Sequence, residues 1–181
     1  MIYQLSEEYF VRTLQENDLE GAYPSWFEDQ EVCRYNSHGK FFKTLADFRD
    51  YIKNVSKEDQ VVWAICHTSD GHIGNIGLRG ISFIDRNAYF AVLIGDKRHW
   101  GKGVAYEAAK VLFKHGFLKL NLERIWSATP APNVAMLKLA KKLGMATEGC
   151  RRSHLYLDGA WVDLIEFGIL RSECLFLTSD D

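Results

Sequence analysis

Residues 98 to 105 read RHWGKGVA and place two glycines, Gly101 and Gly103, three and five residues after Arg98. Glycine lets a backbone turn tightly and lets its amides approach a ligand closely. The residues that follow, YEAAKVLFKHGF, repeat apolar side chains at helical spacing. Because a helix directs its positive dipole end and its unpaired amides toward its start, the stretch predicts an anion-binding turn.

Two common nucleotide motifs do not fit this turn. A Walker loop needs Ser or Thr after its Gly-Lys pair, whereas Gly103 follows Lys102 here. A dinucleotide fingerprint needs a third glycine, where Tyr106 or its neighbours stand. The turn therefore matches neither nucleotide-binding motif.

The surrounding pattern predicts the elements that position the turn. VRTLQENDLEGAYPSWFED predicts an extended stretch and then a helix around Asp18, and TLADFRDYIKNV predicts a second helix. VVWAICHTSDGHIGNIGL predicts a hairpin with its turn at residues 69–71, and AYFAVLIG, RIWSAT and WVDLIEFGIL predict further strands. NVAMLKLAKKLGM predicts an amphipathic helix with Val134, Leu137, Ala140 and Leu143 on one face. We expect one mixed α/β domain over residues 1–181, with helices around a single sheet.

Composition excludes several classes of function. The chain has 181 residues and a formal net charge of -2, so nothing attracts nucleic acid or an acidic membrane surface in general. The first ten residues lack the basic start and apolar run of a secretory signal, and no window reaches membrane-spanning length. We therefore expect a cytoplasmic protein with neither nucleic-acid nor membrane partners.

The cysteines and histidines give little support to a metal site. Four cysteines lie far apart and form no CxxC pair. Cys66, His67 and His72 flank the predicted hairpin turn, but the sequence shows no fourth ligand. The sequence therefore predicts neither disulfides nor a metal.

The ordered motifs resemble the Gcn5-related N-acetyltransferase (GNAT) family. The acetyl-coenzyme A loop of that family reads Arg or Gln, two residues, Gly, one residue, then Gly or Ala, and Arg98, Gly101 and Gly103 match it. NVAMLKLAKKLGM is similar to the family's Asn-to-Lys-Leu-Gly-Phe segment, and the resemblance covers roughly residues 61 to 170. WGKGVAYEA and GAWVDLIEFGIL look most like the RimJ/RimL-like branch, which includes ribosomal-protein and spermidine acetyltransferases.

The resemblance implies a central, mostly antiparallel twisted sheet whose strands splay at the site for acetyl-coenzyme A, the acetyl donor. It implies that the pantetheine arm bonds to Val92, Leu93 and Ile94. Backbone amides of the loop would cradle the pyrophosphate; these belong to Arg98, His99, Trp100, Gly101, Lys102, Gly103, Val104 and Ala105. Asn133 has two readings, as a helix cap and as a coenzyme contact, and both stay open.

Catalysis needs a group that removes a proton, since an alkylammonium is almost fully protonated at neutral pH. The resemblance places a glutamate and a tyrosine in such roles, but Tyr89 and Ala140 occupy the corresponding positions. Three substitutes are His38 as a base, Asp85 to bind or deprotonate the amine, and Tyr156 as a proton donor. Each has a simpler reading, as an exposed loop histidine, a turn-forming aspartate and a hairpin-edge tyrosine, and proton transfer through water is a further alternative.

The acceptor is expected to bind to the N-terminal third of the chain. Its aromatic residues, which suit an amino sugar attached to a nucleotide or simply pack together, are Trp26, Phe27, Tyr35, Phe41 and Phe42. The alternatives are a polyamine and a protein N-terminus, the latter drawn by acidic residues Glu28, Asp29 and Glu31. A non-catalytic acyl-coenzyme A-binding domain is a different class of function, and a homodimer is a family-level expectation.

Overall fold

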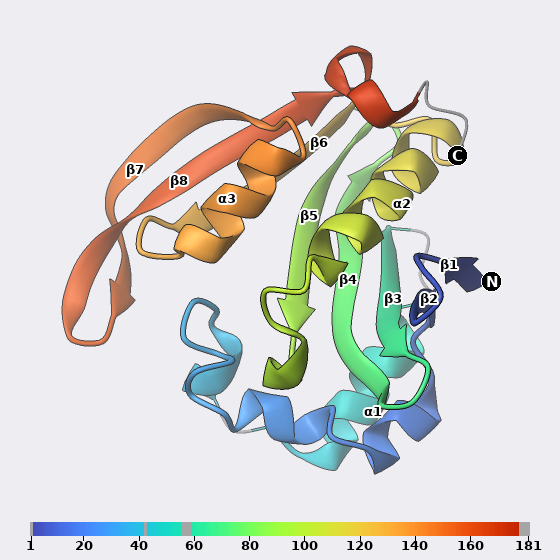
Figure 1. The fold of residues 1–181 in the computed structure, drawn as a ribbon. Helices are drawn as coiled ribbons and strands as arrows, with labels where there is room; N and C mark the ends of the chain where they lie inside the picture. The colour runs from blue at the N-terminus through green and yellow to red at the C-terminus, as the bar shows by residue number, and fades with distance from the viewer. Residues whose placement is uncertain (1, 42, 56–58, 178–181) are drawn as a thin grey trace.

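The computed structural model describes residues 2–41, 43–55 and 59–177, and a single eight-stranded sheet forms its centre (Figure 1). The strand order is β1-β2-β3-β4-β5-β6-β8-β7, and all neighbours are antiparallel except β5 and β6. The strands are β1 Ile2–Gln4, β2 Tyr9–Thr13, β3 Gln60–His67, β4 Gly71–Ser82, β5 Asn87–Ile94, β6 Arg124–Pro130, β7 Ala146–Leu157 and β8 Ala160–Leu170. The expected mixed α/β fold with a mostly antiparallel sheet is confirmed.

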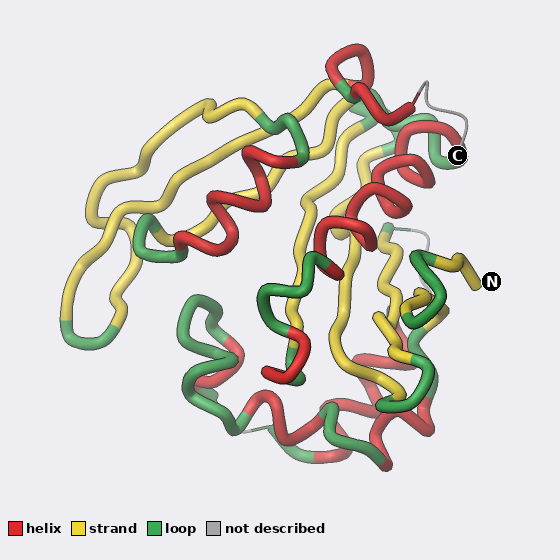
Figure 2. Tube along the Cα trace, in the orientation of Figure 1, coloured by secondary structure: helices red, strands yellow, loops and turns green. Residues whose placement is uncertain are grey.

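Helices cover both faces of this sheet. The α-helices of the described chain are α1 Leu45–Asn54, α2 Val104–Leu118 and α3 Val134–Lys142. The short 3-10 helices are η1 Glu16–Glu20, η2 Pro24–Phe27, η3 His38–Lys40, η4 Lys97–His99, η5 Arg171–Glu173 and η6 Leu175–Leu177. Figure 2 shows α2 and α3 side by side in front of the strands, while the N-terminal segment wraps around the bottom of the sheet. None of the described helices is long and apolar enough to cross a membrane.

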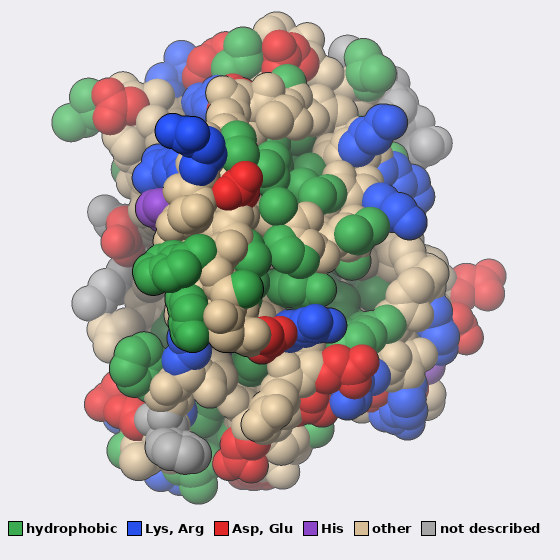
Figure 3. Space-filling model, turned by 90° about the vertical axis from the view of Figure 1, so that its left-hand side faces the viewer, with side chains coloured by type: hydrophobic (Ala, Val, Ile, Leu, Met, Phe, Trp, Pro, Cys, Tyr) green, Lys and Arg blue, Asp and Glu red, His purple; other side chains and the backbone are tan. Residues whose placement is uncertain are grey.

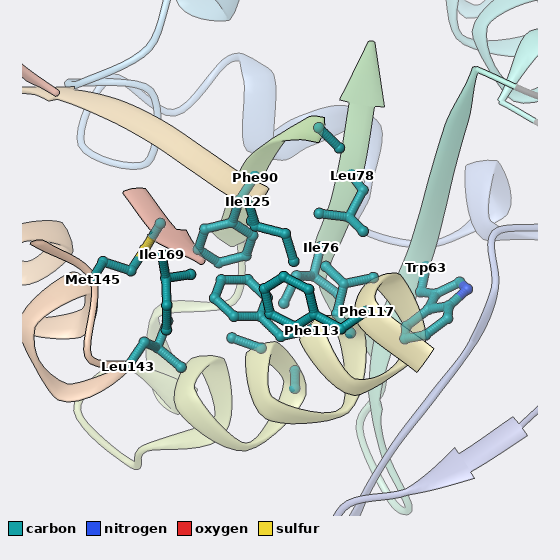
Figure 4. Packing of buried hydrophobic residues seen from close by; sticks show 14 of the residues in the cluster. Trp63, Ile76, Leu78, Phe90, Phe113, Phe117, Ile125, Leu143, Met145 and Ile169 are labelled. Carbon is teal, nitrogen blue, oxygen red and sulfur yellow. The ribbon is translucent and has the colours of Figure 1, made fainter. Parts of the chain in front are cut away.

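The larger hydrophobic core lies between α2 and the middle of the sheet (Figure 4). Phe113 of α2 meets Phe90 of β5 edge to face at 5.0 Å between ring centroids. Gly116 permits close packing of the same helix, since a Cβ there would lie 2.9 Å from Leu78 of β4. Full burial of an apolar side chain such as Phe113 contributes roughly 1.5–3 kcal/mol to the free energy of folding. These contacts hold the start of α2 over the end of β5.

A smaller core fixes the N-terminal segment to the opposite face. It joins residues of that segment to β3; its buried members are Leu14, Tyr23, Trp26, Val32, Phe48, Ile52, Val55, Val62, Ala64 and Cys66. Alternation along β4 explains the two faces, because Ile76 and Leu78 belong to the larger core while Asn75 and Arg79 point the other way. The sheet thus separates a face covered by α2 from a face covered by the N-terminal segment.

Three predictions of local structure were wrong or incomplete. The helix expected around Asp18 is only the short turns η1 and η2, because Gly21 and Pro24 interrupt the segment. Val134 leaves the predicted buried face and is 55% exposed, since it occupies the first position of α3. Only the end of β7 was predicted, as the hairpin edge around Tyr156; the rest of the strand was missed because its residues are mostly exposed and show no alternation.

The remaining expectations for local structure were confirmed. The hairpin turn at 69–71 joins β3 to β4, and the predicted helix after the glycine turn is α2. Cys33, Cys66, Cys150 and Cys174 are all free thiols, and only Cys150 among them is exposed. Phe42 lies outside the described residues.

Candidate active site

The glycine turn begins α2 with a run of unpaired amides. Gly101 and Gly103 adopt left-handed backbone angles, with φ of 73° and 80°, and Gly103 is the N-cap residue of α2. A Cβ at either glycine would meet nothing within 4 Å, so the backbone conformation rather than crowding requires glycine. In the described structure no hydrogen bond uses the amides of residues 101–105 as donors. These amides and the helix dipole are suited to a pyrophosphate, and the contact itself stays a prediction.

The side chain of Arg98 stabilises this turn by pairing with nearby carboxylates. Its guanidinium bonds to the Asp96 carboxylate at 2.6 Å and to Asp70 at 3.3 Å. Hydrogen bonds from Arg98 hold the pKa of Asp96 below its usual value, and they outweigh the opposite effect of burial. Trp100 adds a bond from its indole nitrogen to the carbonyl of Ile94, at 2.8 Å. The loop before α2 is therefore shaped by its own side chains.

Strands β5 and β6 separate just before this loop. They pair in parallel only from Asn87–Arg124 to Tyr89–Trp126. Ser127 of β6 then places its hydroxyl against the carbonyl of Phe90, at 2.8 Å and fully buried. Since alternate residues direct their backbone groups to the same side, Val92 and Ile94 face the splayed edge as Phe90 does. The carbonyl of Ile94 accepts a hydrogen bond from the indole of Trp100. The amide and carbonyl of Val92 therefore remain for hydrogen bonds to a pantetheine arm and a thioester.

Asn133 is a helix cap in this structure. Its side-chain oxygen accepts from the amide of Met136 at 3.2 Å, and its amide nitrogen donates to Thr129 at 3.0 Å. The capping interpretation is confirmed, whereas the coenzyme contact stays a prediction. α3 lies beside the start of α2, and Lys142 of α3 stands over the Tyr106 ring of α2 at 3.9 Å.

A cavity of about 230 Å³ opens between the N-terminal segment and the splayed strand. It reaches Ala91, Val92 and Leu93 of β5, where the acetyl group would lie. Its other lining residues are Tyr23, Phe27, Asn36, His38, Lys43, Asp47, Phe48, Tyr51, Val62, Asn75, Ile76, Gly77 and Arg79. Strands β7 and β8 form a hairpin, called the β7–β8 arm here. Figure 3 shows the side of the molecule that carries this arm, where hydrophobic side chains gather in a central hollow with charged side chains near its rim.

His38 lines this cavity, and its role as a base stays a prediction. Its ring packs edge to face on Phe27 at 5.2 Å, and in the described chain its ring nitrogens form no hydrogen bond. Burial lowers the pKa of His38, and the charges of Arg79 and Lys43 lower it further. The imidazole is therefore neutral at neutral pH and can accept a proton.

Arg79 was missed by the sequence reasoning. Its Nη2 donates to the Tyr51 hydroxyl at 2.8 Å, but its buried Nε has no hydrogen-bond partner in the described structure. A buried donor without a partner costs about 1–3 kcal/mol, more when charged, unless a ligand satisfies it. The signal was available, because polar Asn75 and Arg79 stand four residues apart in β4 and so share a face.

The structure does not bring Asp85 to the cavity. It lies exposed in the turn between β4 and β5, where it pairs with the hydroxyl of Ser82 at 2.9 Å. That turn is at the opposite end of β5 from the splay, so the turn-forming interpretation explains Asp85.

Tyr156 lies beside the cavity but does not line it. Its side chain is 52% exposed on β7 and packs edge to face on Trp161 at 5.4 Å. Its carbonyl accepts from Lys40 at 2.9 Å, and Asp158 pairs with Arg34 at 3.3 Å. The tip of the β7–β8 arm is thus fastened to the loop that carries His38.

The two positions where relatives carry catalytic groups are structural here. Tyr89 packs on Trp126 and donates to the carbonyl of Ala128 at 3.3 Å. Ala140 is 3% exposed within α3. Neither residue supplies a base or acid to the splay.

Two of the three acidic residues expected to attract a peptide are already paired. Residues 95–103 connect β5 to α2 and are called the coenzyme loop here. Lys97 of this loop binds Asp29 at 2.8 Å and Glu31 at 2.9 Å. Hydrogen bonding to Lys97 lowers the pKa of Asp29. These carboxylates hold the N-terminal segment to the loop, which leaves exposed Glu28 as the one unpaired member of the trio.

The splayed strands, the glycine turn and the following helix define a GNAT-type acetyltransferase, and comparison with known proteins agrees. The model of the acetyltransferase (GNAT) domain family matches residues 9–146, so the chain belongs to that family. It is an acetyl-coenzyme A-dependent N-acetyltransferase, as the resemblance implied.

Three relatives illustrate the match. An uncharacterized N-acetyltransferase p20 from Bacillus licheniformis is 30% identical over 89% of this chain and 93% of its own. Spermidine N(1)-acetyltransferase of Escherichia coli strain K12 is 28% identical over 83% of this chain and 74% of its own. The structure of spermidine N-acetyltransferase from Vibrio cholerae in complex with CoA and spermine has a TM-score of 0.83 at 21% identity, covering 96% of this chain and 100% of that one.

Proposed function

We propose that this enzyme acetylates a primary amine of a small molecule that also carries an anionic group, with a nucleotide-linked amino sugar as the preferred acceptor. The observation that carries this proposal is the unpartnered Nε of Arg79, which lines the cavity next to the splayed strand. Lys43 adds a second cation to the same lining. A phosphate or carboxylate would satisfy both.

The walls of the cavity suit a sugar ring. Tyr23, Phe27, Phe48 and Tyr51 provide aromatic surfaces, and Asn75 and Asn36 provide amides for hydroxyl groups. In the proposed reaction the amine attacks the thioester carbon directly while His38 accepts its proton. The backbone amide of Val92 stabilises the oxygen that becomes negative, and coenzyme A leaves as the thiol.

A polyamine is the second candidate, because two of the named relatives are spermidine acetyltransferases. A polycation needs several carboxylates, and the cavity lining has only Asp47. One oxygen of Asp47 is used to cap α1, through bonds from the amide and hydroxyl of Thr44. The charges of this cavity therefore favour the anionic acceptor.

A thiol-release assay with acetyl-coenzyme A tests the proposal against nucleotide-linked amino sugars, spermidine and basic N-terminal peptides. We expect turnover with the first class, and Arg79→Met should raise its KM at least about tenfold. Arg49→Met is the matched control, since Arg49 forms only an exposed pair with Glu16 at 3.6 Å. Turnover of spermidine alone would contradict the anionic acceptor, and coenzyme binding without any turnover would favour a non-catalytic sensor.

A further inference from the structure

We propose that His67, Asp70 and His99 form a binding site for Zn²⁺ where the β3–β4 turn meets the coenzyme loop. His67 ends β3, Asp70 lies in the turn, and His99 belongs to η4. One ligand atom from each residue lies within 4.8 Å of the other two. Sequence spacing conceals this site, because His99 is far from the other two residues along the chain.

The structure also corrects the grouping considered from the sequence. His72 turns to the opposite face, where its Nδ1 lies 3.4 Å from the Asp18 carboxylate. Cys66 is buried in the smaller core. The side chain of His67 therefore lies apart from those of Cys66 and His72, and it faces Asp70 and His99 instead.

The distances are close to those of a coordination shell. Oδ2 of Asp70 is 3.1 Å from Nδ1 of His67 and 3.1 Å from Nε2 of His99. Nitrogen and oxygen ligands of a tetrahedral zinc, each about 2.0–2.2 Å from the metal, stand about 3.4 Å apart. The ligand atoms of the two histidines lie within 4.8 Å of each other, so rotation of the His67 and His99 side chains would bring all three donors onto one metal. Two imidazoles and a carboxylate are a donor set that zinc accepts.

A metal at this site would replace existing contacts, because Nδ1 of His67 accepts a hydrogen bond from the amide of Asp70 at 3.3 Å. Arg98 contacts the other oxygen of Asp70, Oδ1, at 3.3 Å, and its main partner is Asp96. The hydroxyl of Ser69 lies 3.1 Å from Nδ1 of His67, and a bound metal would displace this contact too.

A second layer of contacts orients the buried histidine. The hydroxyl of Tyr9 is 2.9 Å from Nδ1 of His99, and the His99 side chain is 1% exposed. When Nε2 of His99 binds a metal, Nδ1 carries the proton and donates a hydrogen bond to the Tyr9 hydroxyl. Metal-bound histidines typically use their second ring nitrogen in this way. A bound zinc would tie the β3–β4 turn to the loop that shapes the pyrophosphate site.

Calorimetry with zinc chloride on the full chain, first freed of metal by a chelator, tests this site. We expect one Zn²⁺ per chain, with affinity falling at least about tenfold in His67→Ala and in Asp70→Asn. Cys150→Ser and His154→Ala are controls for adventitious binding, because both residues are exposed on β7 and should leave the affinity unchanged.

Thermal unfolding supplies a readout independent of activity. Zinc should raise the melting temperature of the wild type and of both control variants, but not that of His67→Ala, since only a native site gains from the metal. Absence of stoichiometric binding to the wild type would overturn the proposal. Equal affinity in the wild type and His67→Ala would overturn it as well, by placing the metal elsewhere.

Discussion

The indole of Trp26 lies against Gly95 so closely that a Cβ at position 95 would fall 1.9 Å from its ring. Trp26 belongs to η2 in the N-terminal segment, and Gly95 is the residue between β5 and the loop that leads to α2. This contact joins the segment that lines the cavity to the loop that carries the glycine turn. The absence of a side chain at position 95 is therefore a requirement of the assembled site.

Gly95→Ala should displace Trp26 and loosen both halves of the site. Overpacking of this kind costs about 1–3 kcal/mol of unfolding free energy. We expect higher KM values for both acetyl-coenzyme A and the acceptor, measured by thiol release. Gly21→Ala is the matched control, since its nearest contact would be an ordinary 3.7 Å. Unchanged KM values in Gly95→Ala would show that the contact does not couple the halves.

Gly101→Val should weaken coenzyme binding at least about tenfold, which corresponds to 1.4 kcal/mol of binding free energy. A β-branched residue resists the φ of 73° at this position, so the amides around it would no longer converge on the pyrophosphate. Calorimetric titration with coenzyme A measures the change.

Gly159→Val separates that effect from general strain. Gly159 has a φ of 86° and open space around it, but lies at the tip of the β7–β8 arm. The Gly159→Val variant should lose about as much stability as Gly101→Val but keep the coenzyme affinity of the wild type. Equal losses of affinity in the two variants would argue against a local pyrophosphate site.

His38→Asn should lower kcat about 10²–10⁴-fold if the imidazole accepts the proton of the amine. Burial, with the charges of Arg79 and Lys43, lowers the pKa of His38 below the usual 6.5 of histidine. The kcat of the wild type should therefore fall only as pH drops below 6.5, and the variant should lack this acid limb. His154→Asn, an exposed histidine on β7, should behave as the wild type. An unchanged kcat in His38→Asn would favour proton transfer through water.

Local sequence signals predicted the elements around the glycine turn, and the family resemblance added the coenzyme that this turn would bind. The glycines of the turn, the apolar period of α2 and the alternation in β5 all act within a few residues of one another. They predicted a helix start with converging amides, and Gly103 caps α2 as expected. Local chemistry determines this part of the fold, so the sequence alone was informative.

The acceptor side depends on contacts between distant segments, which no local pattern reveals. Arg79 and His38 meet at one cavity although they come from β4 and η3. Asp29 looked available to a peptide, but it pairs with Lys97 across the site. In both cases tertiary packing decided which side chains are free, and that packing follows from the smaller core rather than from a motif.

The buried pair of Arg12 and Asp18 gives a prediction about stability against pH. Two bonds of 2.5 Å and 2.9 Å join the guanidinium to the carboxylate, whose side chain is 3% exposed. Burial raises the pKa of Asp18, but bonds from Arg12 and the amide of Gln15 outweigh it and lower that pKa below 3.8. The ionised carboxylate therefore stabilises the folded state above pH 3.8, and this contribution is lost as pH falls through the lowered pKa.

Asp18→Asn should cost about 3 kcal/mol of unfolding free energy at pH 7, because it leaves Arg12 buried without its anion. Below pH 3.8 the difference between wild type and variant should shrink, since the wild-type carboxylate then becomes protonated as well. Urea unfolding at pH 7 and pH 3 measures both values. Asp158→Asn is the control, because its exposed pair with Arg34 should change stability by no more than about 0.5 kcal/mol. A difference between wild type and Asp18→Asn that stays constant between the two pH values would mean that packing, rather than the charge of Asp18, holds η1 against β2.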